Sequence, residues 1–169
     1  MAVPFHTLDE VTELHYQPEK ANGNMIIEGD NLIALKALLP QFAGRIKCVC
    51  IDPPYNTGEE GWAYNDKVNS PLINDWLGKV VGKDDLTRHD KWLCMMAPRL
   101  KIIKDLMSNN GAIFICIDEN ELPRLISLMD EIFGEDKQVG IITWYKKRKG
   151  SFLSKEMISL TEYIVVYTL

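Results

Sequence analysis

The sequence predicts an α/β domain whose sheet is mostly parallel and ends in an antiparallel pair of strands. Short apolar runs rich in β-branched residues alternate with longer segments whose apolar residues recur every three or four positions. This alternation implies parallel strands joined by helical crossovers, with helices covering both faces of the sheet. The last two apolar runs have no helix between them, so we expect them to pair antiparallel.

The first half of the chain reads as strand, helix and strand. Residues 25–28 are a short strand candidate, and a Gly-Asp-Asn turn follows them. Asp30 or Asn31 in that turn can cap a helix that carries four leucines on one face and that we expect Pro40 and Gly44 to end. Residues 45–52 form an apolar run with β-branched residues, which is typical of a buried strand in a parallel sheet.

The second half alternates in the same way after a long polar stretch. Over residues 56–89 we expect mostly loop, with one short helix near residues 71–79. The later elements are expected to be a helix over 90–107 that is kinked at Pro98 and closed by residues 109–111, a strand over 112–117, a helix over 118–133, and two strands over 139–144 and 162–168.

The composition bounds the function. The chain has 169 residues, 46% of them hydrophobic and 25% charged, which excludes a largely disordered protein and fits one domain. The net charge of −5 excludes a small basic protein that holds nucleic acid by bulk charge. The positive charge is concentrated at the C-terminal end, because residues 146–169 carry 5 basic and 2 acidic side chains.

The cysteines and the N-terminal residues indicate the compartment. We expect all four cysteines to be reduced and buried, and none has zinc-ligand spacing with a histidine, so no metal is expected. The sequence has no apolar run of membrane-spanning length and no signal-peptide core at its N-terminus. We therefore expect a cytoplasmic protein. The cysteines are Cys48, Cys50, Cys94 and Cys116.

Asp52, Pro53, Pro54 and Tyr55, here called the elbow, follow the predicted strand at its carboxyl end, where parallel sheets collect ligands. The two prolines remove two backbone donors, fix two φ angles and push the residues before them into extended conformations. The Asp52 carboxylate and the Pro53 carbonyl can then each accept one N–H of an amino group, while the Tyr55 ring stacks on a base. The alternative is a proline turn that ends a strand, with Asp52 as a surface acid.

The elbow and the three residues after it, Asn56-Thr57-Gly58, resemble motif IV of the S-adenosylmethionine-dependent DNA amino-methyltransferases. The pattern over residues 25–169 is similar to the Mod methyltransferases of type III restriction-modification systems, which belong to the β permutation class. The strings that carry this wider resemblance are Gly29-Asp30-Asn31-Leu32, Tyr64-Asn65-Asp66, Arg88-His89-Asp90-Lys91-Trp92-Leu93, Leu128-Met129-Asp130-Glu131-Ile132-Phe133-Gly134 and Glu162-Tyr163-Ile164.

Residues 1–24 are mixed in composition and are expected to be an irregular or weakly helical lead-in. The resemblance implies part of a Rossmann-like methyltransferase domain over residues 25–169. It implies transfer of a methyl group from S-adenosylmethionine to the N6 atom of an adenine that is flipped out of double-stranded DNA. The elbow would bind the adenine, and Asp30 and Asp52 would lie near the cofactor; Asp30 could equally be a helix N-cap. The implied partners are DNA, a second copy of the chain and a restriction subunit with nuclease and helicase activity.

Two groups of residues could contact DNA. The basic side chains of Lys146, Lys147, Arg148 and Lys149 could meet phosphates at the start of a target-recognition region over residues 146–160, or form a solvated loop. Trp62 and Tyr64 in the long polar stretch could line the base pocket or simply pack. We interpret His89 as a residue at a helix start rather than an acid–base catalyst.

The sequence departs from the family in one respect. The glycine-rich Phe-x-Gly-x-Gly motif, which in this class holds the methionine part of the cofactor, does not occur in the 169 residues. We therefore expect an incomplete methyltransferase domain that alone binds cofactor poorly and methylates little. The competing hypothesis is a catalytically silent module with the same fold that binds DNA or protein. A weaker alternative is amino methylation of RNA or of protein glutamine.

Overall fold

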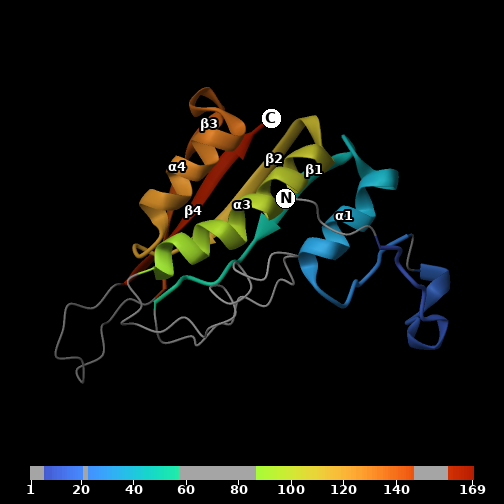
Figure 1. Ribbon diagram of the computed structural model, residues 1–169. Coiled ribbons are helices and arrows are strands. Elements are labelled where there is room, and N and C mark those ends of the chain that lie inside the picture. The colour runs from blue at the N-terminus through green and yellow to red at the C-terminus, as the bar shows by residue number, and fades with distance from the viewer. Residues whose placement is uncertain (1–5, 21–22, 58–86, 147–159) are drawn as a thin grey trace, which may run out of the picture.

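The computed structural model describes residues 6–20, 23–57, 87–146 and 160–169. Two short 3-10 helices lie in the N-terminal segment, and a third follows α4. The main elements, labelled in Figure 1, are α1 (Asn31–Phe42), β1 (Ile46–Ile51), α3 (Arg88–Leu106), β2 (Met107–Ile117), α4 (Leu122–Phe133), β3 (Gln138–Tyr145) and β4 (Thr161–Thr168).

The four strands form one mixed sheet in the order β1-β2-β4-β3. The β1 and β2 strands pair in parallel, whereas β4 is antiparallel to both of its neighbours, β2 and β3. Because β4 is antiparallel to both of its neighbours, β1, β2 and β3 run in one direction and β4 runs in the opposite direction. This confirms the predicted α/β fold with mostly parallel strands and a C-terminal antiparallel pair.

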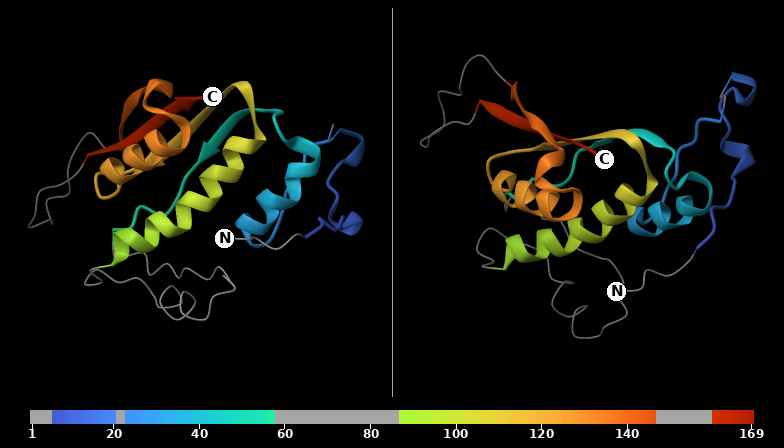
Figure 2. Two further views of the ribbon diagram at one scale, coloured as in Figure 1. Left: turned by 45° about the horizontal axis from the view of Figure 1, so that its top comes forward. Right: turned by 90° about the horizontal axis from the view of Figure 1, so that it is seen from above.

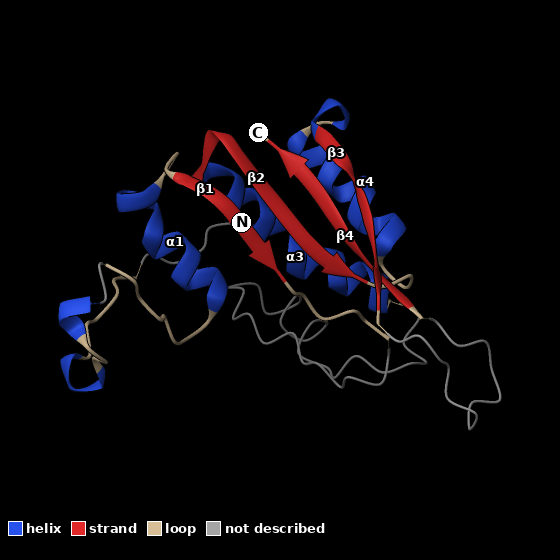
Figure 3. Cartoon of the chain, turned by 180° about the vertical axis from the view of Figure 1, so that it is seen from behind, coloured by secondary structure: helices blue, strands red, loops and turns tan. Residues whose placement is uncertain are grey.

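The helices of the described part lie on one face of the sheet, which corrects the expectation of helices on both faces. Figure 3 looks at the uncovered face, with α3 and α4 behind the strands, and the right view of Figure 2 shows the two helices together on one side. The reason is the direction of the crossovers. Both β1-α3-β2 and β2-α4-β3 move across the sheet the same way, and right-handed crossovers in one direction place their helices on one face.

The core lies between the sheet and α3 and α4. Alternate residues of β2 and β4 point into it and are fully buried, as are the inward side chains of both helices. The α1 helix packs against α3 at the edge of this layer. Among the largest fully buried side chains are Trp92, Leu100, Ile113, Ile115, Leu125, Met129 and Tyr167.

Three predictions about individual elements differ from the structure. Residues 25–28 form no strand, and Ile26 is fully exposed, because no described strand lies beside them to pair with. Of the two residues expected to end the first helix, Pro40 lies inside α1, whereas Gly44 follows directly after its C-cap Ala43. Residues 109–111 belong to β2 and do not close α3, since that helix ends at Leu106 and the strand begins directly after it.

The cysteines also differ from the expectation. All four are free, but Cys48, Cys50 and Cys94 are exposed and Cys116 is half-buried. Cys48 and Cys50 lie on β1. This strand is therefore not buried on both faces, although its apolar sequence predicted that it would be. In the part of the chain that is described, no helix is long and apolar enough to cross a membrane, and no group of side chains is arranged to hold a metal ion.

Candidate active site

The elbow leaves the sheet at the carboxyl end of β1, as predicted. Ile51 is the last strand residue, and residues 52–57 continue without regular structure. Asp52 is exposed, Pro53 is buried, and Tyr55 is half-buried. The acid and the ring therefore remain accessible at the edge of the sheet, while the backbone between them is packed against the protein.

A pocket of about 300 Å³ opens beside the elbow, at the lower end of the roughly 300–1,000 Å³ that small-ligand sites occupy. The register explains its lining. Cys116 of β2 pairs with Ile164 of β4, which pairs with Ile142 of β3, and paired residues point to the same face. Two residues further along, Trp144 and Glu162 face the same way. The uncovered face of the sheet therefore forms the floor of the pocket with Cys116, Trp144, Glu162 and Ile164, and Asp52, Tyr55 and Tyr163 complete the lining.

The pocket keeps its hydroxyl and thiol groups neutral. Burial, a hydrogen bond to Asp52 and the negative charge of that carboxylate raise the pKa of Tyr55 above its ordinary value. Burial raises the pKa of Cys116 as well, and the nearby charge of Asp52 adds to the effect. A phenol and a thiol that stay protonated leave Asp52 and Glu162 as the charged acceptors of the pocket.

Lys146 is the one predicted DNA-binding residue that the described part contains. Its ammonium group lies 5.8 Å from the centre of the Tyr55 ring and pairs with the Glu162 carboxylate. The side chain is therefore placed at the mouth of the pocket, where a cation can meet both an aromatic face and a negative group. The other predicted DNA-binding residues, Trp62, Tyr64, Lys147, Arg148 and Lys149, lie outside the described residues.

Asp30 caps α1, as one of its two predicted roles requires. Its Oδ1 atom accepts a hydrogen bond from the backbone N–H of Leu32 at 2.9 Å and a longer one from Ile33 at 3.4 Å. Gly29 before it has a φ of +141°, a value that favours glycine. The carboxylate itself is exposed. A role near a cofactor remains a prediction.

The elbow is held from the helix side by residues that the sequence reasoning missed. The indole N–H of the fully buried Trp92 donates to the Pro54 carbonyl at 2.7 Å. The buried Asn56 side chain donates to the Arg88 carbonyl at 3.2 Å and to Glu121 at 2.5 Å. Trp92 reads as one more apolar position of a helix face, and Glu121 as one of several acids before a helix. Neither pattern indicates a contact with residues 38 and 65 positions away.

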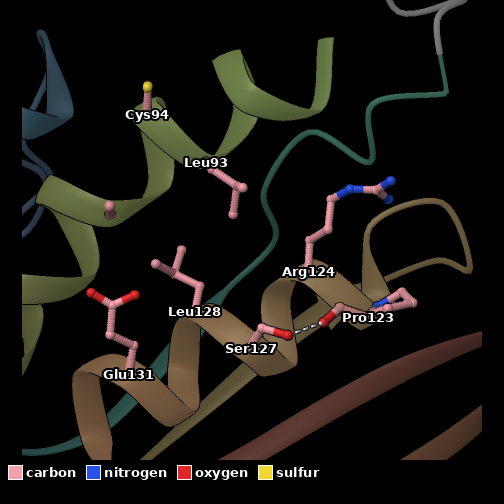
Figure 4. Close-up of a pocket in the computed structure, with 8 residues that line it drawn as sticks. Leu93, Cys94, Pro123, Arg124, Ser127, Leu128 and Glu131 are labelled. Carbon is pink, nitrogen blue, oxygen red and sulfur yellow. Dashed lines mark hydrogen bonds between the residues drawn. The ribbon is translucent and has the colours of Figure 1, made fainter. Parts of the chain in front are cut away.

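A second pocket, of about 650 Å³, lies in the groove between α3 and α4 and contains none of the predicted site residues. Figure 4 shows Leu93 of α3 on the side that faces Leu128 and Arg124 of α4, while the Cys94 thiol points away from α4. The Ser127 hydroxyl in this groove donates to the Pro123 carbonyl of its own helix at 3.1 Å. The groove is mainly apolar and brings together no convergent acceptors like those at the elbow.

Comparisons with known proteins show which sequences this chain resembles. A protein-family model described as DNA methylase matches residues 46–168. The Mod subunit of the type III restriction-modification enzyme EcoP15I from Escherichia coli is 36% identical over 181 residues, which cover 98% of this chain and 28% of that protein. The EcoPI Mod subunit of Escherichia phage P1 is 34% identical over 180 residues, with 98% and 28% coverage.

The chain thus spans less than a third of the length of these two relatives. A solved structure of TTHA0409 from Thermus thermophilus, complexed with S-adenosyl-L-methionine, aligns with 79% of this chain and 52% of that protein. The sequence identity is 16% and the TM-score is 0.44.

Proposed function

Because the chain belongs to the DNA methylase family, we propose that it carries the target-amine site of an adenine-N6 DNA methyltransferase of a type III restriction-modification system. The observation that supports this most directly is the pocket at the carboxyl end of β1. It joins the Asp52 carboxylate and the aromatic side chains of Tyr55 and Trp144 in a space of about 300 Å³, next in the chain to the two prolines of the elbow. The target would be an adenine flipped out of double-stranded DNA.

The elbow would bind the adenine by its amino group. The Asp52 carboxylate accepts one N–H of the exocyclic amine and the Pro53 carbonyl accepts the other. A carboxylate has lone pairs for several donors, so Asp52 can accept from the amine and from the Tyr55 hydroxyl together. The Tyr55 ring stacks on one side of the base and Trp144 bounds the other. Two acceptors in the plane of the base polarise the N–H bonds of the amine. They thereby raise the electron density on the nitrogen, which donates an electron pair to the methyl group.

S-adenosylmethionine would supply the methyl group on a positively charged sulfur. The residues present suit that group chemically, since Asp52 offers an exposed carboxylate to a cation and Asp30 offers another beside the first turn of α1. Asp52 would also stabilise the positive charge that develops on the amine nitrogen during transfer. The acceleration then comes from alignment and electrostatics in a site where the acceptors are already in place.

The partners belong to the same proposed function. Lys146 at the pocket mouth and the basic residues 147–149 after it would contact DNA phosphates near the extruded base. A second copy of the chain and a restriction subunit would act with it, as in restriction-modification enzymes that assemble from separate subunits.

The test is Asp52→Ala in the protein at its natural length, assayed by transfer of a tritiated methyl group from S-adenosylmethionine to DNA. We expect the rate to fall by at least about 100-fold, because the variant removes an acceptor aimed at developing charge. The fold should be spared, since an exposed surface side chain contributes about 0.5 kcal/mol or less. Methyl transfer at the wild-type rate by Asp52→Ala would exclude Asp52 from the mechanism, and transfer to cytosine alone would exclude adenine as the target.

A further inference from the structure

Glu121 is a carboxylate that is fully buried immediately before α4. Burying a carboxylate is costly unless hydrogen bonds and opposite charges compensate it. Glu121 does not cap its own helix, because its side chain makes no hydrogen bond to the helix backbone. Its hydrogen-bond partners lie on two other segments of the chain, and they show what the buried carboxylate holds in place.

Both short contacts of Glu121 go to one atom. Its Oε1 accepts from the Asn56 side-chain amide at 2.5 Å and lies 2.5 Å from Nδ1 of His89. On the other side of the ring, Arg88 donates to Nε2 of His89 at 3.3 Å, which leaves Nδ1 as the ring nitrogen that donates to Glu121. The second oxygen, Oε2, has Arg124 at 3.8 Å. The carboxylate therefore joins the residues after the elbow to the first turns of α3 and α4.

Asn56 is the link to the elbow, and its backbone explains why it is an asparagine. It has a φ of +59°, in the left-handed region that asparagine tolerates better than most residues. That conformation turns the chain one residue after Tyr55, and the buried amide then reaches Glu121 and the Arg88 carbonyl. The turn and the contact depend on the same residue.

The elbow needs such a tie because it cannot hold itself. Pro53 and Pro54 have no N–H, so these two positions of the elbow donate no backbone hydrogen bonds. Trp92 fixes the Pro54 carbonyl, and Asn56 fixes the exit of the elbow. Because both hydrogen bonds come from the helix side of the elbow, the side chains of Asp52 and Tyr55 remain available to line the pocket.

We propose that Glu121 is a positioning residue for methyl transfer: through Asn56, with His89 as its second donor, it holds the elbow in the geometry that receives the target amine. This inference rests on the proposed function for its catalytic readout. It assigns no contact between Glu121 and the substrate. A displacement of the elbow by about 1 Å is enough to lower a rate by a factor on the order of 100.

The experiment compares variants of the protein at its natural length in single-turnover transfer of tritiated methyl groups from S-adenosylmethionine to unmethylated double-stranded DNA. Asn56→Gly removes the amide and keeps the left-handed backbone unstrained. Glu121→Ala removes the acceptor, and Glu121→Gln keeps an acceptor oxygen without the charge. The matched control is Tyr167→Phe, which deletes a 2.6 Å hydrogen bond to Asp130 from a buried tyrosine in the core.

We expect Asn56→Gly and Glu121→Ala each to lower the rate about 100-fold, with the KM for S-adenosylmethionine changed by less than about threefold. Glu121→Gln should recover most of the rate. The double variant should be no slower than either single one, because both break the same link. Tyr167→Phe should stay within about threefold of wild type. If the rate falls no more in Asn56→Gly than in Tyr167→Phe, the inference is overturned.

A second readout needs no catalysis. The indole N–H of Trp92 is protected while it donates to Pro54, so its exchange with solvent, followed by NMR, reports the order of the elbow. We expect at least about tenfold faster exchange in Asn56→Gly, with the exposed Trp144 indole as an internal reference. Unchanged Trp92 exchange would overturn the positioning role. A wild-type protein that transfers no methyl group would instead refute the proposed function, and Trp92 exchange would still decide the positioning.

Discussion

Replacing Trp92 with phenylalanine tests how strongly the helix layer holds the elbow. Trp92 is fully buried, and its indole N–H donates to the Pro54 carbonyl at 2.7 Å. Phenylalanine keeps an aromatic ring in the core but has no donor, so the carbonyl loses its partner. A partly buried acceptor left unpaired costs about 1–3 kcal/mol. The missing part of the indole leaves a cavity in the core that costs about another 1 kcal/mol.

We therefore expect Trp92→Phe to lower the free energy of unfolding by about 2–4 kcal/mol. The measurement is urea unfolding followed by far-ultraviolet circular dichroism, which does not depend on the fluorescence of the residue that is removed. Trp144→Phe is the control, because that indole is 59% exposed and its loss should cost about 0.5 kcal/mol or less. A cost below about 1 kcal/mol for Trp92→Phe, equal to that of the control, would refute the anchoring of Pro54 by this indole.

Three further predictions concern the frame of the site. Gly111→Ala should lower the Tm, since an added Cβ would lie 2.9 Å from the carbonyl oxygens of Ile46 and Ser108 and cost about 1–3 kcal/mol; an unchanged Tm would contradict this packing. Asp30→Ala should cost about 1 kcal/mol in urea unfolding through loss of the α1 cap, and an equal loss in Asp30→Asn would contradict the cap, because asparagine caps as well. The alkylation rate of Cys116 should keep rising with pH beyond the range where an ordinary thiol has ionised, because its pKa is raised and the reactive thiolate forms only at higher pH; a plateau in the ordinary range would show an unshifted thiol.

The sequence predicted the position of the elbow correctly because the signal is local. Two consecutive prolines after an apolar run determine backbone geometry wherever they occur, and the position after β1 follows from the strand alone. The helix cap at Asp30 was predictable for the same reason, since it depends on contacts two and three residues away. Features of this kind need no knowledge of distant partners.

The contacts that complete the site were not predictable, because they join segments far apart in the chain. Trp144 reaches the pocket only through the register of β3 on β4 and of β4 on β2, which a single sequence does not specify. Glu121 meets Asn56 across 65 positions. The strand expected over residues 25–28 fails for a related physical reason, since a strand forms only where another strand accepts its hydrogen bonds.

The choice of prolines in the elbow has a thermodynamic consequence for binding. Each proline restricts the backbone in the unfolded chain as well as in the folded one, so the conformational entropy of ordering this segment is lost before any nucleotide arrives. Under the proposed function, encounter with a base would then require little further ordering of the protein, and more of the contact energy would appear as affinity. A segment of ordinary residues with the same acceptors would have to be immobilised anew at every turnover.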